Sequence, residues 1–256
     1  FWLDRGVDGF RMDVVHLIGK DPELGDDPAE LAALSHVPLN NRPETHELLR
    51  GLRLLLDGYD GDRTAIGEVY LFDTKMVAEH YGHNDELHLN FNFPPLFTPW
   101  DSVKWRTQIE RASHELDPIG AWPTWVLSNH DVMRHASRLG RSSATVQVDT
   151  GGIGPDDEQP DAELGLRRAR AATAVMLALP GSAYLYQGEE LGLPDGVLPD
   201  DVLLDPTWER SGHTMRGRDG CRVPMPWERA APSYGFGPGP STWLPQPAAY
   251  GALAVD

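Results

Sequence analysis

Short apolar segments alternate along this chain with helix-like segments, and this alternation constrains the possible folds more than any other feature. The expected strands are residues 9–14, 64–69, 87–91, 125–128 and 183–186. The expected helices are residues 44–57, 74–81, 101–116 and 162–179. The strand–helix order predicts an α/β fold with a parallel sheet or barrel.

Two connecting regions are long and irregular. Residues 141–159 contain closely spaced glycines and little periodicity, which predicts a surface loop. Residues 192–246 are rich in Pro, Gly and Trp, and large aromatic side chains in such a region favour packing over a pocket. Because barrel enzymes build their sites from long loops, we expect residues 192–246 to form an active-site loop region.

The charge balance excludes some classes of partner. The chain has 39 acidic and 22 basic residues and a formal net charge of −17, so it would be repelled by nucleic acids and by anionic membrane surfaces. Its longest apolar stretch, residues 171–186, is interrupted by Pro180 and is too short to span a bilayer. With one cysteine, Cys221, it cannot form an intrachain disulfide, so we expect a reducing, cytoplasmic location. The oligomeric state is left open.

The first expected strand ends in a charged pair. Alternation along residues 9–13 places Arg11 and Asp13 on one side and the apolar Phe10 and Met12 on the other. In a parallel barrel the apolar pair lies under the outer helices, and the charged pair points into the mouth. An arginine beside a carboxylate holds it ionised, as a carboxylate nucleophile requires. A solvent-facing ion pair is the alternative.

Two further carboxylates end other expected strands. Glu68 follows Gly67, which leaves room for close approach of another backbone or a ligand, and Asp131 follows the strand at residues 125–128. Either carboxylate alone could be a helix N-cap or a loop charge. Three at the strand ends on the active side of a barrel favour a common site. Two carboxyl groups flanking a glycosidic bond are the equipment for retaining glycoside hydrolysis, and a third can bind sugar hydroxyls.

Several motifs together resemble one family. The runs GVDGFRMDV at residues 6–14, IGEVY at 66–70 and SNHD at 128–131 resemble the second, third and fourth signature regions of the α-amylase superfamily, glycoside hydrolase family 13. Residues 179–192 resemble the segment around its eighth barrel strand, and residues 218–227 the loop typical of its α-glucosidases and oligo-1,6-glucosidases. Five motifs in the order typical of the family favour this resemblance far more than a single motif would.

The resemblance implies a fold and a role for each motif residue. Residues 1–256 would form part of a (β/α)8 TIM barrel, strands four to eight with long βα loops. By this resemblance, the first three strands and the C-terminal β-domain would be absent from these residues. It implies three catalytic carboxylates: Asp13 as nucleophile, Glu68 as general acid/base and Asp131 as transition-state stabiliser. It also places three residues in the substrate-binding site: Arg11, which would brace the nucleophile, and His130 and Arg222, which would contact the sugar. No cofactor is expected, and no metal site from these residues.

Some alternatives stay open at this point. His130 could instead be a packed loop residue, and Arg222 could form an ion pair with Asp219 or a neighbouring acid. The expected activity is that of a retaining, exo-acting α-glucosidase that hydrolyses terminal α-linked glucose from maltose- or isomaltose-type oligosaccharides. Val14 after the expected nucleophile favours the oligo-1,6-glucosidase type. The alternatives are an α-glucan transglycosylase, a sucrose- or trehalose-converting enzyme, or a non-catalytic barrel subunit of an amino-acid transporter.

Overall fold

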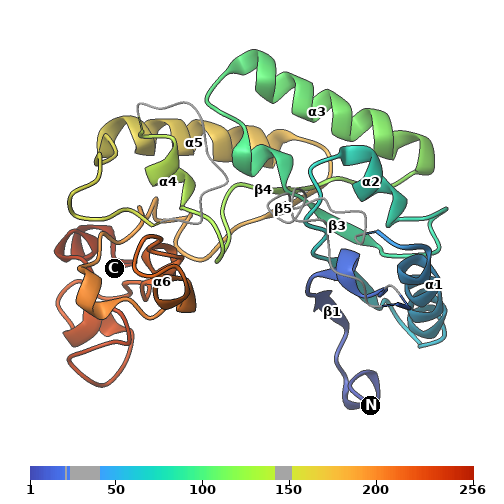
Figure 1. The fold of residues 1–256 in the computed structure, drawn as a ribbon, viewed down its shortest axis with the longest axis horizontal. Helices are drawn as coiled ribbons and strands as arrows, with labels where there is room; N and C mark the ends of the chain where they lie inside the picture. The colour runs from blue at the N-terminus through green and yellow to red at the C-terminus, as the bar shows by residue number, and fades with distance from the viewer. Residues whose placement is uncertain (21, 24–40, 142–151) are drawn as a thin grey trace. The chain divides into compact units, whose positions relative to one another are not determined.

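The computed structural model describes residues 1–20, 22–23, 41–141 and 152–256 (Figure 1). The chain divides into two compact units. The first comprises Phe1–Pro95, Arg106–Trp125 and Pro180–Ser182, and the second comprises Leu96–Trp105, Val126–Leu179 and Ala183–Asp256. Residues 142–151 of the expected loop at residues 141–159 lie outside the described residues, and its described part, residues 141 and 152–159, has no helix or strand.

Five strands form one sheet in the order β1-β2-β3-β4-β5. They are β1 (Gly9–Met12), β2 (Thr64–Gly67), β3 (Leu89–Asn92), β4 (Thr124–Val126) and β5 (Ser182–Tyr184). The pairs β1–β2, β2–β3 and β3–β4 are parallel. Consecutive parallel strands separated by helices confirm the expected α/β fold, because a parallel connection needs a crossover segment.

The expected helices are present, with ends within two residues of the predicted ones. They are α1 (Pro43–Asp57), α2 (Thr74–Glu79), α3 (Ser102–Leu116) and α5 (Ala162–Ala178). Two short helices were not predicted: α4 (His135–Arg138) and α6 (Pro206–Arg210). With four and five residues, they are too short to show a helical repeat in the sequence.

Helix α1 supplies much of the core of the first unit. Pro43 lies at its first turn, where the missing N–H costs nothing, and Leu49 and Leu56 are 1% exposed. Phe10 and Met12 of β1 pack against the same cluster. The apolar side of β1 therefore lies under a helix, as predicted, and this fixes which side carries Arg11.

Helix α5 packs closely on α4 in the second unit. The Asp161 side chain caps its first turn by accepting a hydrogen bond from the Leu164 N–H at 2.9 Å. A Cβ atom at Gly165 would lie 2.1 Å from the Ala136 carbonyl oxygen, so only glycine allows this approach. Pro180 and Gly181 follow the end of the helix, as expected.

The Pro-, Gly- and Trp-rich residues 192–246 belong to the second unit and pack around their own apolar cluster. Its buried members are Leu193, Leu198, Val223, Met225, Leu244 and Tyr250. A cavity of about 590 Å³ lies in this region, lined by Tyr234, Trp243 and Gln246 among others. A loop region with its own core can hold polar side chains in fixed positions, which matters for the site below.

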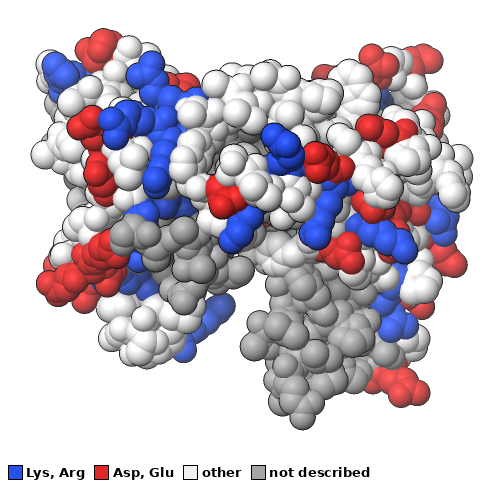
Figure 2. All heavy atoms as spheres, turned by 90° about the horizontal axis from the view of Figure 1, so that it is seen from above, with Lys and Arg blue, Asp and Glu red and all other residues white. Residues whose placement is uncertain are grey.

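Charged side chains of both signs occur on the face shown in Figure 2. On the face shown in Figure 2, blue basic and red acidic side chains alternate over the described residues without forming one continuous basic area.

Candidate active site

Asp13 and Glu68 directly follow the paired strands β1 and β2. Met12 and Gly67 are partners in the parallel register, so the next residues lie at the same level of the sheet edge. The Glu68 N–H donates to the Met12 carbonyl oxygen at 2.8 Å, which continues the pairing by one residue. Strand register therefore brings together two of the three predicted carboxylates.

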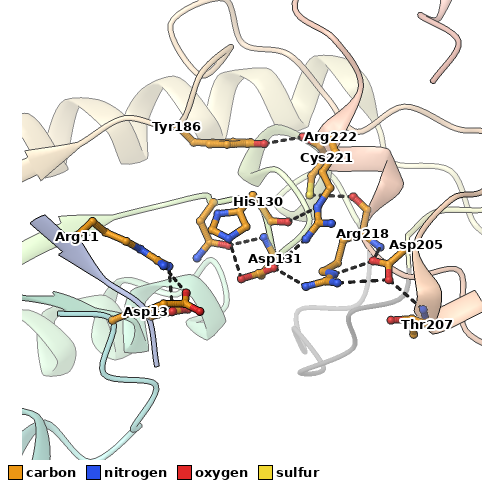
Figure 3. A network of polar contacts seen from close by, with 12 residues as sticks. Arg11, Asp13, His130, Asp131, Tyr186, Asp205, Thr207, Arg218, Cys221 and Arg222 are labelled. Carbon is orange, nitrogen blue, oxygen red and sulfur yellow. Dashed lines mark hydrogen bonds and ion pairs between the residues drawn. The ribbon is translucent and has the colours of Figure 1, made fainter. Parts of the chain in front are cut away.

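Arg11 binds both of these carboxylates. Its Nη1 forms an ion pair with Asp13 Oδ1, drawn in Figure 3, and its Nη2 lies 2.9 Å from Glu68 Oε2. One guanidinium that holds two carboxylates fixes their mutual orientation, because its donors have a rigid, planar arrangement. The predicted side-by-side placement of Arg11 and Asp13 is confirmed, with Glu68 as a further partner.

The two carboxylates have different surroundings. The side chain of Asp13 is 71% exposed and that of Glu68 only 11%. Burial, and then a hydrogen bond with Asp13, raises the pKa of Glu68, while the Val14 N–H and the charge of Arg11 act in the opposite direction. Glu68 therefore keeps its proton to higher pH than an ordinary glutamate, which suits a general acid.

The turn after β1 has an unusual backbone. Val14 has φ 46°, in the left-handed region that β-branched residues rarely adopt. In this conformation its N–H donates to Glu68 Oε2 at 3.2 Å, and the Val15 N–H donates to the Glu68 carbonyl oxygen at 3.0 Å. Such strain occurs where surrounding contacts hold the backbone in place, and here those contacts are made with Glu68.

Gly67 is closely approached, as predicted, but by side chains. A Cβ atom at Gly67 would lie 2.4 Å from Leu87 Cδ1 and 2.6 Å from Asn90 Oδ1. The missing Cβ thus allows β2 to pack against β3 and the residues just before it.

The second unit carries the third predicted carboxylate. Asp131 lies in the loop after β4, where Arg218 Nη1 and Arg222 Nη2 donate to its Oδ1 at 2.8 and 3.0 Å (Figure 3). His130 Nε2 lies 3.2 Å from its Oδ2. With its side chain 49% exposed, His130 is not the packed loop residue of the alternative reading.

Arg222 pairs with Asp131 rather than with Asp219. Its Nε donates to the His130 carbonyl oxygen at 2.8 Å, which holds it beside the loop after β4. Asp219 is buried and accepts hydrogen bonds from two backbone N–H groups, those of Leu204 and Asp205. The predicted group of His130, Asp131 and Arg222 is therefore brought together.

Sequence reasoning missed two members of this group. Arg218 lies inside the motif at residues 218–227 but received no role, and Asp205 was not singled out. Asp205 lies in an irregular segment without a motif, so its partnership with Arg218 becomes visible only in the structure.

A fully buried arginine holds the surrounding loops. Arg134 donates to the carbonyl oxygens of Gln187 at 2.7 Å and Cys221 at 3.0 Å, and its guanidinium lies 4.7 Å from the centre of the Tyr186 ring. The Tyr186 hydroxyl donates to the same Cys221 carbonyl oxygen. Burial raises the pKa of the Cys221 thiol, which is therefore unreactive and serves the packing of this turn.

Neither a metal-binding cluster nor a membrane-spanning helix occurs in the described part of the chain. No group of three or more His, Cys, Asp and Glu side chains there is arranged to hold a metal ion. None of the helices there is long and apolar enough to cross a membrane.

The entire chain, residues 1–256, matches the family model described as the alpha amylase catalytic domain. The chain belongs to the alpha-amylase family. This confirms the resemblance drawn from the motifs, and with it the assignment of the α/β fold to part of the family's catalytic barrel.

Curated relatives of this alpha-amylase family chain include α-glucosidases. A probable alpha-glucosidase of Rhizobium meliloti (strain 1021) is 32% identical over 262 residues, which cover 96% of this chain and 43% of the relative. An oligo-1,6-glucosidase of Parageobacillus thermoglucosidasius is 28% identical over 285 residues, which cover 96% of this chain and 45% of the relative. The chain spans less than half the length of these relatives.

Solved structures agree with the family assignment. The alpha-glucosyl transfer enzyme XgtA is similar with a TM-score of 0.80 and 34% identity, covering 99% of this chain and 46% of the other. An isomaltulose synthase from Erwinia rhapontici NX5 is similar with a TM-score of 0.72 and 21% identity, covering 99% of this chain and 47% of the other. It shares the fold.

Proposed function

We propose that the protein containing this chain is a retaining, exo-acting α-glucosidase that removes terminal glucose from small α-linked oligosaccharides. One observation carries the proposal: Asp13 and Glu68 leave adjacent parallel strands at the same level and share the guanidinium of Arg11. Retaining hydrolysis needs two carboxyl groups close together, one exposed and ionised and the other able to hold a proton. The names of the relatives, α-glucosidase and oligo-1,6-glucosidase, support the same activity.

The proposed reaction has two displacements. Asp13 attacks the anomeric carbon and forms a glycosyl ester, while the bond to the leaving oxygen breaks and that oxygen takes the proton of Glu68. Glu68 then removes a proton from water, which attacks the anomeric carbon and releases Asp13 and glucose. The raised pKa of Glu68 supports its role as the proton donor in the first displacement. The ion pair with Arg11 supports the ionised state of Asp13.

We assign the remaining predicted residues to the sugar. Asp131 would accept hydrogen bonds from sugar hydroxyls that strengthen as positive charge develops on the ring, and His130 and Arg222 would bind substrate beside it. Their mutual contacts support a shared role. The exo-acting type is proposed from the α-glucosidase names of the relatives.

Glucosyl transfer is the second candidate. The likeness to an alpha-glucosyl transfer enzyme at 34% identity favours it, and it uses the same glycosyl ester with a sugar in place of water. We also propose a cytoplasmic location, which the buried free thiol of Cys221 supports.

Product analysis tests both candidates in the full-length protein. Proton NMR of the digestion of an aryl α-glucoside, in which glucose is the only sugar released by hydrolysis, should show α-glucose first, because two displacements retain the configuration. Initial release of β-glucose would contradict the proposed mechanism. Longer oligosaccharides in place of free glucose would favour glucosyl transfer over hydrolysis.

A further inference from the structure

The two arginines that bind Asp131 are anchored in different ways. Arg222 is held by one backbone carbonyl oxygen, that of His130. Arg218 is held by a carboxylate, because its Nε donates to Asp205 Oδ2 at 2.6 Å while its Nη1 donates to Asp131 Oδ1 at 2.8 Å (Figure 3). The guanidinium of Arg218 thus bridges two aspartates, of which only Asp131 belongs to the predicted site.

The Asp205 side chain is buried and is held by hydrogen bonds to both of its carboxylate oxygens. Its side chain is 0% exposed, and its Oδ1 caps helix α6 by accepting from the Thr207 N–H at 2.9 Å. Its Oδ2 accepts from the backbone N–H of Arg218 at 2.9 Å as well as from the side chain. Gly217, at φ 72°, lies so close that a Cβ atom would be 2.7 Å from Asp205 Cγ. Asp205 therefore fixes both the main chain and the guanidinium of Arg218.

The surroundings of Asp205 and Arg218 favour the charged form of both side chains. Burial opposes ionisation of Asp205, but hydrogen bonds from Arg218 and Thr207 hold its pKa well below the usual range. The hydrogen bond with Asp205 in turn raises the pKa of Arg218. Because the Asp205 side chain is fully buried, loss of Arg218 would leave an uncompensated buried charge, which is costly.

We propose that Asp205 and Arg218 are positioning residues that fix the rotamer of Asp131. Two guanidinium donors occupy Oδ1, so Asp131 presents Oδ2, on the side of His130, to a sugar hydroxyl. This inference rests on the proposed function, in which Asp131 binds the sugar. It assigns to Asp205 a role in sugar recognition although the residue lies in a segment without a motif.

A double-mutant cycle in the full-length protein tests the proposal. Arg218→Lys keeps the charge but loses the planar fork, and Asp131→Asn removes the carboxylate that Arg218 is proposed to position. On an aryl α-glucoside, we expect Arg218→Lys to lower kcat by about 10²-fold, the cost of a small misplacement, with little change in KM. In the Asp131→Asn background the same change should lower kcat by less than about threefold, because the two residues act as a unit.

A purely structural role gives a different result. If Arg218→Lys lowers kcat by the same factor in both backgrounds, or leaves kcat unchanged in the wild type, the positioning role is wrong. Asp205→Asn should reproduce the effect of Arg218→Lys if it folds, and the lysine variant decides the question if it does not. Asp200→Asn is the matched control, since Asp200 pairs with Arg216 in the same loop region and its side chain is 63% exposed. It should leave kcat unchanged.

The same cycle can be followed by binding of 1-deoxynojirimycin in isothermal titration calorimetry. There too, the effect of Arg218→Lys on Kd should largely disappear in the Asp131→Asn background. Wild-type protein that binds this iminosugar but releases no glucose would refute the proposed hydrolysis while the positioning role remains measurable in Kd. Equal changes in Kd in both backgrounds would refute the positioning role alone.

Discussion

The first unit holds its charged group on regular strands, whereas the second holds its group on loops. Asp13 and Glu68 each follow one member of a register pair of β1 and β2. The arginine that binds them, Arg11, lies in β1. Asp131 is placed by Arg218 and Arg222, which come from a segment about ninety residues away in sequence. A strand pair positions side chains through its backbone, while loops need side-chain contacts to do so.

The two groups also differ in how their arginines are supported. Arg11 lies on a strand whose apolar side packs under α1, so the backbone already sets its direction. Arg218 has a dedicated buried carboxylate, Asp205, and the nearby turn is held by the buried Arg134. In the first unit orientation depends mainly on packing, and in the second it depends mainly on hydrogen bonds.

The largest effect is expected at the exposed carboxylate of the strand pair. Asp13→Asn in the full-length protein should lower kcat by about 10⁴-fold or more on any α-glucoside, because the nucleophile is removed with little change in volume. Steady-state kinetics measure the loss, and circular dichroism should show an unchanged fold. Asp8→Asn, just before β1, is the control because its side chain is 84% exposed and, among the residues that the structure describes, forms an ion pair only with Arg63. A residual activity near the wild-type level in Asp13→Asn would remove Asp13 from the nucleophile role.

A smaller, substrate-dependent effect is expected at the buried carboxylate. Glu68→Gln should cost about 10²–10⁴-fold in kcat on maltose, and much less on a glucoside with a good leaving group, which needs little protonation. Because burial raises the pKa of Glu68, kcat/KM of the wild type should fall as pH rises through a value above the ordinary glutamate pKa of about 4.3.

The comparison of pH profiles completes this test. The alkaline fall should be absent in Glu68→Gln, since no proton remains to be lost there. Glu163→Gln on α5, with a side chain 85% exposed, should keep the wild-type profile. Equal losses on both substrate types, or an unchanged alkaline fall, would exclude Glu68 as the general acid.

The same difference between strands and loops explains what the sequence could predict. The period-two pattern of residues 9–13 predicted the directions of Arg11 and Phe10, because alternation is a property of every strand. The role of Asp205 could not be predicted, since its contact with Arg218 depends on the path of an irregular loop with no repeat. In these irregular loops the motifs allowed a prediction for Arg222 but not for the nearby Arg218.

The smallest effect concerns the packing beneath the strand pair. Leu49→Ala should lower the free energy of unfolding by about 2–5 kcal/mol, because Leu49 of α1 is 1% exposed and its loss leaves a cavity. Leu48→Ala, one residue earlier and 56% exposed, should change it by less than about 0.5 kcal/mol. Urea unfolding of the full-length protein compares the two. Similar losses for both would show that α1 does not support β1 in the way described.

The central claim is that the β1 strand end carries the nucleophile, and trapping the glycosyl ester tests it most directly. The full-length protein would be incubated with 5-fluoro-α-D-glucosyl fluoride, digested and mapped by mass spectrometry. We predict one added fluoroglucosyl group on the peptide that contains Asp13, and none in the Asp13→Asn variant. A label on Glu68, on Asp131 or on a residue elsewhere in the protein would contradict the account.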